Sequence, residues 1–368
     1  MSKPATKPRP KSAITQLDAY RPDLAGGDAS VAIRLSVNEG ALGASPKVRE
    51  AIKHASTTDV LHRYPDQISH TLTQAIADFT GLDAARILPA NGSDELISLL
   101  ASAYINAGDE AIITQYGFLV FRQVIEVAGG TAVVAKDKNM TASVDAIIAA
   151  ITSRTKLIFL ANPNNPTGTA LKRQDLARLI ANIPPEIVLV IDGAYAEYRH
   201  GDAEYSDGAE FVESHANVVM LRTFSKIFGL AGLRLGWGYF PPDIYATLAK
   251  IRPAFSVNAI AAIAGTAAIQ DRDFFDKSLA HNAHWLLQIQ DSLRQAGFTP
   301  LPTTANFFLL KFASASQADA AHAFLLRRGI LLRKMAGYGL PAYLRMSIGT
   351  KDEMIQVAHV FKDLAVEL

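Results

Sequence analysis

The sequence predicts an α/β protein with a mostly parallel β-sheet, followed by a smaller α+β domain. At 368 residues, the chain is longer than one hydrophobic core usually serves. Short apolar runs, each too short for a buried helix, alternate with helical segments in the first two thirds of the chain. After residue 272 the pattern changes to a long helix followed by more widely spaced apolar runs. Two domains of different build are therefore expected.

The alternating part shows clear start signals for helices. Ser45 and Pro46 are typical of an N-cap followed by a proline at the first helical position. Ser93 is expected to cap another helix, because Asp94 then lies in a first turn where the helix dipole favours acidic side chains. The predicted buried strands are 111–113, 157–160, 187–191 and 218–221, and the predicted helices between them are 116–128, 143–151 and 171–182.

The alanine-rich segment 258–270 is apolar on nearly all sides and predicts a buried helix, between domains or at a subunit interface. A long helical stretch then ends at Gly297, and apolar runs follow at 306–311, 330–332 and 343–348. From these changes we predict a mobile tail of residues 1–15, a large domain of residues 45–265, and a small domain formed by residues 16–44 and 266–368.

The composition excludes several classes of site. The chain has no cysteine, which excludes disulfide bridges, thiolate zinc sites and cysteine nucleophiles. The formal net charge is +1, and nothing in the charge pattern favours a nucleic-acid partner. No secretory signal is visible, and no segment reaches the roughly 18 apolar residues that a membrane helix needs. We expect a cytoplasmic protein without a metal site and without a membrane or nucleic-acid partner.

A polar loop follows the predicted strand at 157–160. Residues 162–168 read NPNNPTG and lie where open α/β sheets place their ligand-binding loops, at the carboxyl end of a strand. Two X-Pro bonds so close together can be cis and fix a sharp loop. The same composition is typical of an ordinary turn, so the segment alone leaves both interpretations open.

An acidic residue, Asp192, ends the next predicted strand, and Tyr195 follows it closely. Such a pair can hold a heterocyclic ligand at the end of a strand. The simpler interpretation is a helix N-cap followed by a packing tyrosine. The pair alone does not decide between them.

A third segment, residues 222–236, reads RTFSKIFGLAGLRLG and surrounds Lys226 with apolar residues and glycines. Burial and a nearby cation both disfavour an ammonium group, so the pKa of this lysine should be lowered. A neutral amine is what a Schiff base requires. A surface loop with incidental charges is the alternative, which the apolar neighbours disfavour.

Taken together and in this order, the three segments resemble the fold-type I aminotransferases that use pyridoxal 5'-phosphate (PLP). The third segment is most similar to the histidinol-phosphate aminotransferases. The resemblance extends from about residue 35 to the C-terminus and implies a homodimer whose large domain is a three-layer α/β/α structure. Its further motifs are LSVNE at 35–39, RYPD at 63–66, NGSDE at 91–95 and LRMSIGT at 344–350.

The resemblance implies a role for each matching residue. Lys226 would hold PLP as a Schiff base and, once released, carry a proton between substrate and cofactor. Asp192 would keep the pyridine nitrogen protonated, which makes the ring an electron sink. The other cofactor contacts would be Asn165 and Tyr195 at the O3′ oxygen, Ser93, Asp94, Thr223, Ser225 and Arg234 around the phosphate, Phe118 or Tyr116 on the ring, and Tyr64 from the neighbouring subunit.

Two arginines would recognise the substrate. Arg345 resembles the family's carboxylate-binding arginine, whose planar fork suits a carboxylate. Arg333 matches an arginine that would meet the phosphate of histidinol phosphate, although it is also interpretable as a surface arginine. Asn38 and Tyr64 would lie beside the substrate. The implied reaction is a ping-pong transamination of L-histidinol phosphate with 2-oxoglutarate, giving imidazole-acetol phosphate and glutamate in histidine biosynthesis.

Departures from the family pattern leave other functions open. Residues 38–41 read NEGA instead of the usual NENP, Leu42 replaces a common aromatic residue, and Gly193 follows Asp192 where glutamate is usual. Because the first two changes lie near the substrate, an aromatic-amino-acid aminotransferase is a serious alternative. A threonine-phosphate-type decarboxylase shares the loop at 162–168, but segment 222–236 favours an aminotransferase. A PLP-sensing regulator would need a DNA-binding helical module, for which the residues before Val31 show no pattern.

Overall fold

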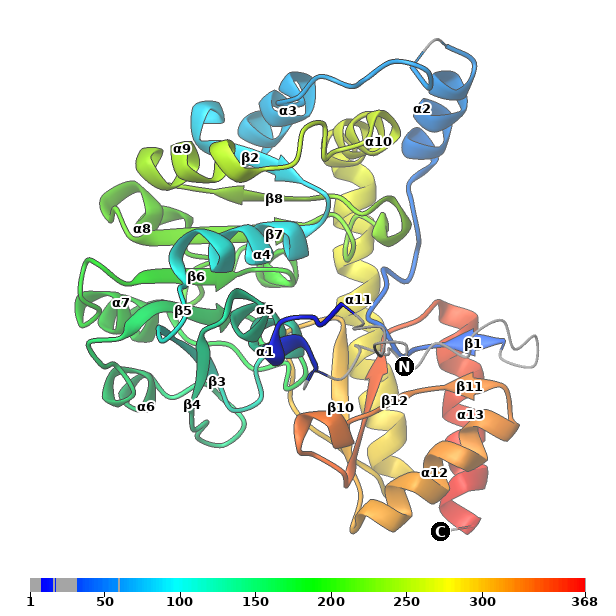
Figure 1. The fold of residues 1–368 in the computed structure, drawn as a ribbon. Coiled ribbons are helices and arrows are strands. Elements are labelled where there is room, and N and C mark those ends of the chain that lie inside the picture. Colours follow the sequence, from blue (N-terminus) through cyan, green and yellow to red (C-terminus); the bar gives the residue numbers. More distant parts are fainter. Residues whose placement is uncertain (1–7, 16, 18–31, 59, 368) are drawn as a thin grey trace, which may run out of the picture.

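A seven-stranded sheet forms the centre of the molecule (Figure 1). The computed structural model describes residues 8–15, 17, 32–58 and 60–367. The strand order is β2-β8-β7-β6-β5-β3-β4, and β8 alone runs antiparallel to its neighbours, so the prediction of a mostly parallel sheet is confirmed. The strands are β2 Ile87–Ala90, β3 Glu110–Thr114, β4 Thr131–Ala135, β5 Thr155–Ala161, β6 Val188–Asp192, β7 Val218–Thr223 and β8 Gly236–Tyr239.

The side chains of the central strands alternate between two apolar cores, one on each face of the sheet. On β6, Leu189 and Ile191 belong to the first core, whereas Val188 and Val190 belong to the second. Strands β5 and β7 alternate in the same way. Because helices cover both faces, these strands are apolar at almost every position, which is the pattern that made them recognisable.

Helices on the two faces give the three-layer α/β/α arrangement, which confirms the predicted fold class. The first core is covered by α2 Pro46–Ser56, α3 His70–Thr80, α6 Val144–Ala149, α7 Arg173–Ala181, α8 Ala209–Ser214 and α10 Ala259–Gln270. The second core is covered by α4 Ser93–Tyr104, α5 Leu119–Ala128 and α9 Pro242–Ile251.

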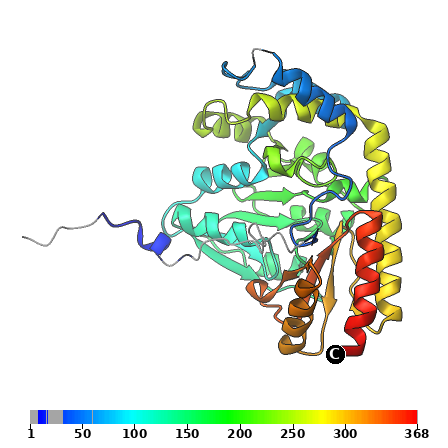
Figure 2. The same ribbon diagram turned by 90° about the vertical axis from the view of Figure 1, so that its right-hand side faces the viewer.

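A smaller α+β part follows α11 Arg272–Gln295, a long helix that passes beside both sheets (Figures 1 and 2). Its four-stranded antiparallel sheet has the order β12-β13-β10-β9, and β1 pairs in parallel with β11. These strands are β1 Ile33–Arg34, β9 Thr299–Pro300, β10 Phe307–Lys311, β11 Ile330–Leu331, β12 Arg333–Lys334 and β13 Tyr343–Ser347, and the helices are α12 Ala315–Arg327 and α13 Lys351–Glu367.

This smaller part has its own apolar core, built from α11, α12, α13, β10 and β13. We propose that it forms the small domain together with the N-terminal segment, with the bounds expected from the sequence. Of the predicted tail, residues 1–7 lie outside the described residues, and Ser12–Thr15 form the short helix α1. Within the described part of the chain, no helix is both long and apolar enough to cross a membrane.

Two predictions about local structure have clear outcomes. Ser45 caps α2 by accepting a hydrogen bond from the N–H of Val48 at 3.2 Å, as expected. The predicted cap at Ser93 is wrong, because Ser93 is the first residue of α4 and Gly92 takes the N-cap position. Gly92 has φ of 80°, a conformation that a residue with a side chain rarely adopts.

Candidate active site

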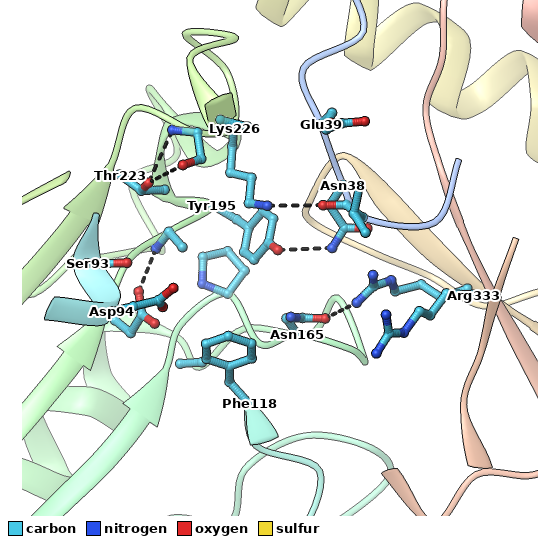
Figure 3. A pocket seen from close by; sticks show the side chains of 18 of the residues that line it. Asn38, Glu39, Ser93, Asp94, Phe118, Asn165, Tyr195, Thr223, Lys226 and Arg333 are labelled. Atoms are coloured by element: carbon cyan, nitrogen blue, oxygen red, sulfur yellow. Dashed lines mark hydrogen bonds between the residues drawn. The ribbon is translucent and has the colours of Figure 1, made fainter. Parts of the chain in front are cut away.

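A cavity of about 460 Å³ opens at the carboxyl ends of β5, β6 and β7, between the large sheet and the smaller part (Figure 3). Side chains from both parts of the molecule line it. Apart from Tyr64 and Tyr116, the second candidate for the ring, every site residue predicted from the sequence lies on its wall. These residues are Asn38, Ser93, Asp94, Phe118, Asn165, Asp192, Tyr195, Thr223, Ser225, Lys226, Arg234, Arg333 and Arg345.

Lys226 lies in the turn after β7 and extends its amine into the cavity. Its Nζ donates a hydrogen bond to the carbonyl oxygen of Val37 at 3.2 Å and lies 5.6 Å from the ring centre of Tyr195. Burial, helped by the positive charge of Arg345, lowers the pKa of Lys226 to about 8. A substantial fraction of this amine is therefore neutral near physiological pH, as a nucleophile requires.

Asp192 is the last residue of β6, and its buried carboxylate faces the same cavity. Burial raises its pKa to about 7, and the negative charge of Asp94 adds to the effect. Its Oδ1 accepts a hydrogen bond from the N–H of Ala194 at 3.1 Å. Among the described residues, no lysine, arginine or histidine forms an ion pair with it. A bound cation at this position would complete the site.

The N-terminus of α4 forms one end of the cavity and is suited to an anion. Gly92 provides no side-chain cap, so the first N–H groups of the helix are not used by a capping side chain. A Cβ on Gly236 would lie 2.4 Å from the nitrogen of Ser93, so glycine is needed for this close approach. The backbone at this end of the cavity is therefore arranged to bind a negatively charged group.

Three polar side chains complete this end of the cavity. The hydroxyl of Thr223 donates to Ser225 at 3.0 Å, and Arg234 donates to the same hydroxyl of Ser225 at 3.4 Å. Arg234 also forms an ion pair with Asp94 at 3.3 Å. A hydroxyl pair and a guanidinium beside a helix N-terminus are donors that a phosphate group prefers.

Opposite this end, Tyr195 and Asn38 meet across the two parts of the molecule. The Nδ2 of Asn38 donates to the hydroxyl of Tyr195 at 2.9 Å. Burial raises the pKa of Tyr195 to about 12, so the tyrosine keeps its proton and can donate a hydrogen bond. Ser347 fixes the position of Asn38 with two hydrogen bonds. Its hydroxyl donates to Oδ1 of Asn38 at 3.0 Å and accepts from the backbone N–H of Asn38 at 2.9 Å.

Two buried arginines enter the cavity from the small sheet. Arg333 on β12 is the direct cross-strand partner of Arg345 on β13, and cross-strand partners lie on the same face of a sheet. Arg345 donates to the side-chain oxygen of Asn165 and to the carbonyl oxygen of Ser36 at 2.7 Å. Two guanidiniums on the same face of the small sheet bring several hydrogen-bond donors for an anion to this part of the cavity wall.

The aromatic candidates have different positions. Phe118, at the N-cap of α5, lines the cavity, whereas Tyr116 packs in an apolar cluster with Leu309, Met335 and Tyr338. Tyr64 lies outside the cavity of its own chain. Its side chain is largely exposed, and its ring stacks on Phe255 with the ring centres 4.5 Å apart.

The sequence reasoning gave no role to some residues of the cavity wall, of which Glu39 and Tyr338 are the polar examples. Glu39 belongs to a recognised motif, but nothing in the sequence signalled Tyr338. In the loop after β5, the Asn162–Pro163 and Asn165–Pro166 bonds are both cis, which is one of the two possibilities that the sequence left open. Pro163 and Asn165 from this loop line the cavity.

Comparison with known proteins agrees with this geometry. Residues 30–361 match the family described as aminotransferase class I and II. The chain is 45% identical to a histidinol-phosphate aminotransferase of Rhodospirillum centenum over 90% of its length and 91% of that protein. It is 42% identical to one of Granulibacter bethesdensis over 97% of its length and 96% of that protein.

The chain is also similar to a solved structure of a histidinol-phosphate aminotransferase. The crystal structure of histidinol-phosphate aminotransferase from Sinorhizobium meliloti in complex with pyridoxal-5'-phosphate has a TM-score of 0.89 and 27% sequence identity to this chain. The alignment covers 99% of both chains.

The lowered pKa of Lys226 leads to a direct prediction. In the protein without added ligand, reductive methylation of Lys226 should increase with pH through a midpoint of about 8, because only the neutral amine reacts. Peptide mass spectrometry after short labelling at a series of pH values measures this midpoint. Lys53, an exposed lysine in the last turn of α2, serves as the control for the labelling reaction itself. A midpoint for Lys226 as high as that of a free lysine side chain, about 10.4, would contradict the assignment.

Proposed function

Because the chain belongs to the class I and II aminotransferases and, within them, to the histidinol-phosphate aminotransferases, we propose that it transfers the amino group of L-histidinol phosphate to 2-oxoglutarate. The products would be imidazole-acetol phosphate and glutamate, in a step of histidine biosynthesis. The observation that carries this proposal is the buried pair Arg333 and Arg345, which enters the cavity from paired strand positions. A phosphate monoester and a dicarboxylate are anions that such a pair can bind in turn.

The residues of the cavity fit pyridoxal phosphate as the cofactor. The helix N-terminus at Ser93 and Asp94, with Thr223, Ser225 and Arg234, would hold its phosphate. Phe118 would pack on the ring, and Asn165 and Tyr195 would donate to its O3′ oxygen. When bound, the cofactor supplies an electron sink for the bond that breaks at the substrate Cα.

Lys226 would first bind the cofactor and then act as the acid and base of the reaction. Its neutral amine can remove the proton from the Cα of the amino donor and return it at C4′ of the cofactor. The lowered pKa makes this amine available near neutral pH without a further base. Asp192 would face the ring nitrogen. A positive charge there lowers the pKa of the carboxyl below its value in the ligand-free protein, so Asp192 would be ionised at neutral pH.

Substrate binding would use the opposite end of the cavity. Arg345, already held by Asn165 and Ser36, would bind the α-carboxylate of 2-oxoglutarate. Arg333 would bind the phosphate of histidinol phosphate. L-Histidinol phosphate and an aromatic amino acid each carry one anionic group, so the number of arginines fits both donors. The 42–45% identity to histidinol-phosphate aminotransferases supports the phosphorylated substrate over the aromatic alternative.

We expect Arg333→Gln to remove most of the preference for a phosphorylated donor. A lost charge-assisted hydrogen bond contributes about 1.5–3 kcal/mol, so KM for L-histidinol phosphate should rise about 10- to 100-fold. KM for L-histidinol, which lacks the phosphate, should change little. Steady-state kinetics with both donors measures the two KM values. The control is Arg327→Gln, at an exposed arginine of α12. An equal effect on both donors would contradict the role of Arg333.

We also propose a homodimer in which Tyr64 reaches the phosphate site of the neighbouring subunit. Its support is the exposed aromatic stack of Tyr64 and Phe255, together with the exposed Leu61 and Ile68 in the same stretch of sequence as Tyr64. Exposed large apolar side chains of this kind are typical of an interface.

Sedimentation equilibrium should therefore give twice the chain mass of 39.6 kDa. Tyr64→Phe should leave the mass unchanged and weaken cofactor binding about tenfold, because a charge-assisted hydrogen bond is lost. A fully active protein of single-chain mass would rule out this arrangement.

We further propose that the enzyme is cytoplasmic. A phosphate monoester is charged and does not enter an apolar bilayer unassisted, so its substrate stays in the compartment where it is made.

A further inference from the structure

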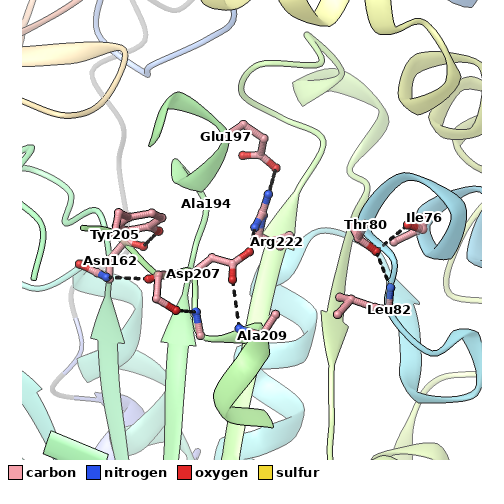
Figure 4. A network of polar contacts seen from close by, with 12 residues as sticks. Ile76, Thr80, Leu82, Asn162, Ala194, Glu197, Tyr205, Asp207, Ala209 and Arg222 are labelled. Carbon is pink, nitrogen blue, oxygen red and sulfur yellow. Dashed lines mark hydrogen bonds and ion pairs between the residues drawn. The ribbon is translucent and has the colours of Figure 1, made fainter. Parts of the chain in front are cut away.

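A largely buried polar cluster surrounds Arg222 at the ends of β5 and β7 (Figure 4). The alternation of side chains along these strands places it on the opposite face of the large sheet from the cofactor site. We call it the rear cluster. It consists of Asn162, Glu197, Tyr205, Asp207 and Arg222, which come from the ends of β5 and β7, the turn after β6 and the loop before α8. None of these five side chains takes part in the mechanism described above.

Arg222 is the centre of the rear cluster. Its Nε and Nη2 both donate to Oε1 of Glu197, at 3.0 and 2.9 Å, and its Nη1 donates to Asp207. Arg222 and Glu197 are almost fully buried. Removing such charges from water costs about as much as their attraction returns, so a buried ion pair does little for net stability. Its directional bonds do fix the positions of the segments that carry them.

The alternation of side chains along each strand couples the rear cluster to the cofactor site. On β7, Thr223 faces the cavity and the preceding residue, Arg222, faces the rear cluster. At the end of β5, Ala161 faces the cavity. The following residue, Asn162, directs its side chain to the rear, where its Nδ2 donates to the carbonyl oxygen of Ser206 at 3.4 Å. The two sites therefore use adjacent residues of the same strands.

The turn that contains Asp192 and Tyr195 packs directly against the side chain of Arg222. A Cβ on Gly193 would lie only 3.1 Å from Cδ of Arg222, so the backbone of this turn packs against the arginine side chain. The N–H of Gly193 also donates to the carbonyl oxygen of Leu221 at 2.9 Å. Glu197, the main partner of Arg222, lies two residues after Tyr195.

Further hydrogen bonds connect the cluster to the loop that contains Asn165. The hydroxyl of Tyr205 donates to the carbonyl oxygen of Asn162 at 2.7 Å. The N–H of Asn162 donates to the carbonyl oxygen of Asp192 at 2.9 Å, and its side-chain oxygen accepts from the N–H of Leu171 at 2.8 Å. Residues 205–207 thus connect the end of β5 with the end of β7.

We infer that the rear cluster positions Asp192, Tyr195 and Asn165 against the cofactor ring, with Arg222 as its central positioning residue. The inference rests on the proposed function, because it assigns these three residues to the ring. Arg222 acts through the geometry of the turn and touches neither substrate nor cofactor. A displacement of about 1 Å in catalytic groups can lower a rate about 100-fold, so a cluster that fixes their positions should have a measurable effect on the reaction rate.

Three variants test whether the rear cluster positions these residues. Tyr205→Phe removes one hydrogen bond, and Asp207→Asn removes one charge of the cluster. Arg222→Lys keeps the positive charge but replaces three donor nitrogens in a fixed plane by a single flexible ammonium. The mild change at Tyr205 keeps the test informative even if Arg222→Lys does not fold. Glu210→Gln is the control, because it breaks an exposed ion pair with Arg173 at the rim of the cavity beside the cluster.

The readouts are the cofactor dissociation constant, the pH midpoint of the visible band of the bound cofactor, and the half-reaction with an amino donor. If Asp192 and Tyr195 lose their alignment, the ring nitrogen and O3′ of the cofactor lose their hydrogen-bond partners. The pH midpoint of the visible band should then rise by about one unit, which is a tenfold change in the acid dissociation constant. The maximal half-reaction rate should fall about tenfold, while the half-saturating concentration of L-histidinol phosphate stays unchanged, because Arg333, the proposed contact of its phosphate, lies on the other sheet.

A purely structural role would lower the melting temperature of the variants without moving the midpoint, the cofactor affinity or the half-reaction rate, and that result would overturn the inference. The outcomes of the two proposals can be told apart. A wild-type protein that binds the cofactor but does not react with histidinol phosphate contradicts the proposed substrate. The band midpoint and the cofactor affinity still test the rear cluster in that protein.

Discussion

The parallel arrangement of β5, β6 and β7 is the constraint on which the rest of the site depends. Parallel strands buried on both faces end at one edge of the sheet, so the polar residues that follow them converge there. Asp192 ends one of these strands, and Asn165 and Lys226 follow the other two in short turns. Because neighbouring positions face opposite sides of the sheet, the same edge also holds the buried cluster around Arg222.

The charges at this edge are arranged in two opposing regions. The helix N-terminus at Ser93, with Arg234, favours an anion at one end of the cavity, and Arg333 with Arg345 favours an anion at the other. Lys226 lies between them, and burial beside this positive charge makes its amine easier to deprotonate. A site for a phosphorylated cofactor and a second anionic ligand therefore also creates the neutral amine that the chemistry needs.

Much of this could be predicted from the sequence. The strands were recognisable because both faces are covered and almost every position is apolar, and Lys226 was recognisable because apolar residues surround it. The pairing of Arg333 with Arg345 could not be predicted, since β12 has only two residues and no periodic pattern. The start of α4 was misplaced by one residue because the backbone conformation of Gly92 decides it.

The rear cluster and the position of Tyr64 were beyond sequence reasoning for a different reason. Asp207 lies in an irregular loop, so its contact with Arg222 depends on how distant segments pack. Tyr64 is exposed on its own chain, and the role that we propose for it would require a second copy of the chain. Local patterns identify the reactive groups, whereas their partners follow from tertiary and quaternary structure.

The central claim is amino transfer from a phosphorylated donor, and a single half-reaction tests it most directly. The purified, cofactor-loaded enzyme would be mixed with L-histidinol phosphate, L-phenylalanine or L-threonine phosphate without a keto acid, and the visible absorbance followed. We predict loss of the visible band with L-histidinol phosphate at a much lower concentration than with L-phenylalanine. A preference for phenylalanine would contradict the proposed substrate. Release of carbon dioxide from threonine phosphate, without pyridoxamine phosphate, would contradict amino transfer itself.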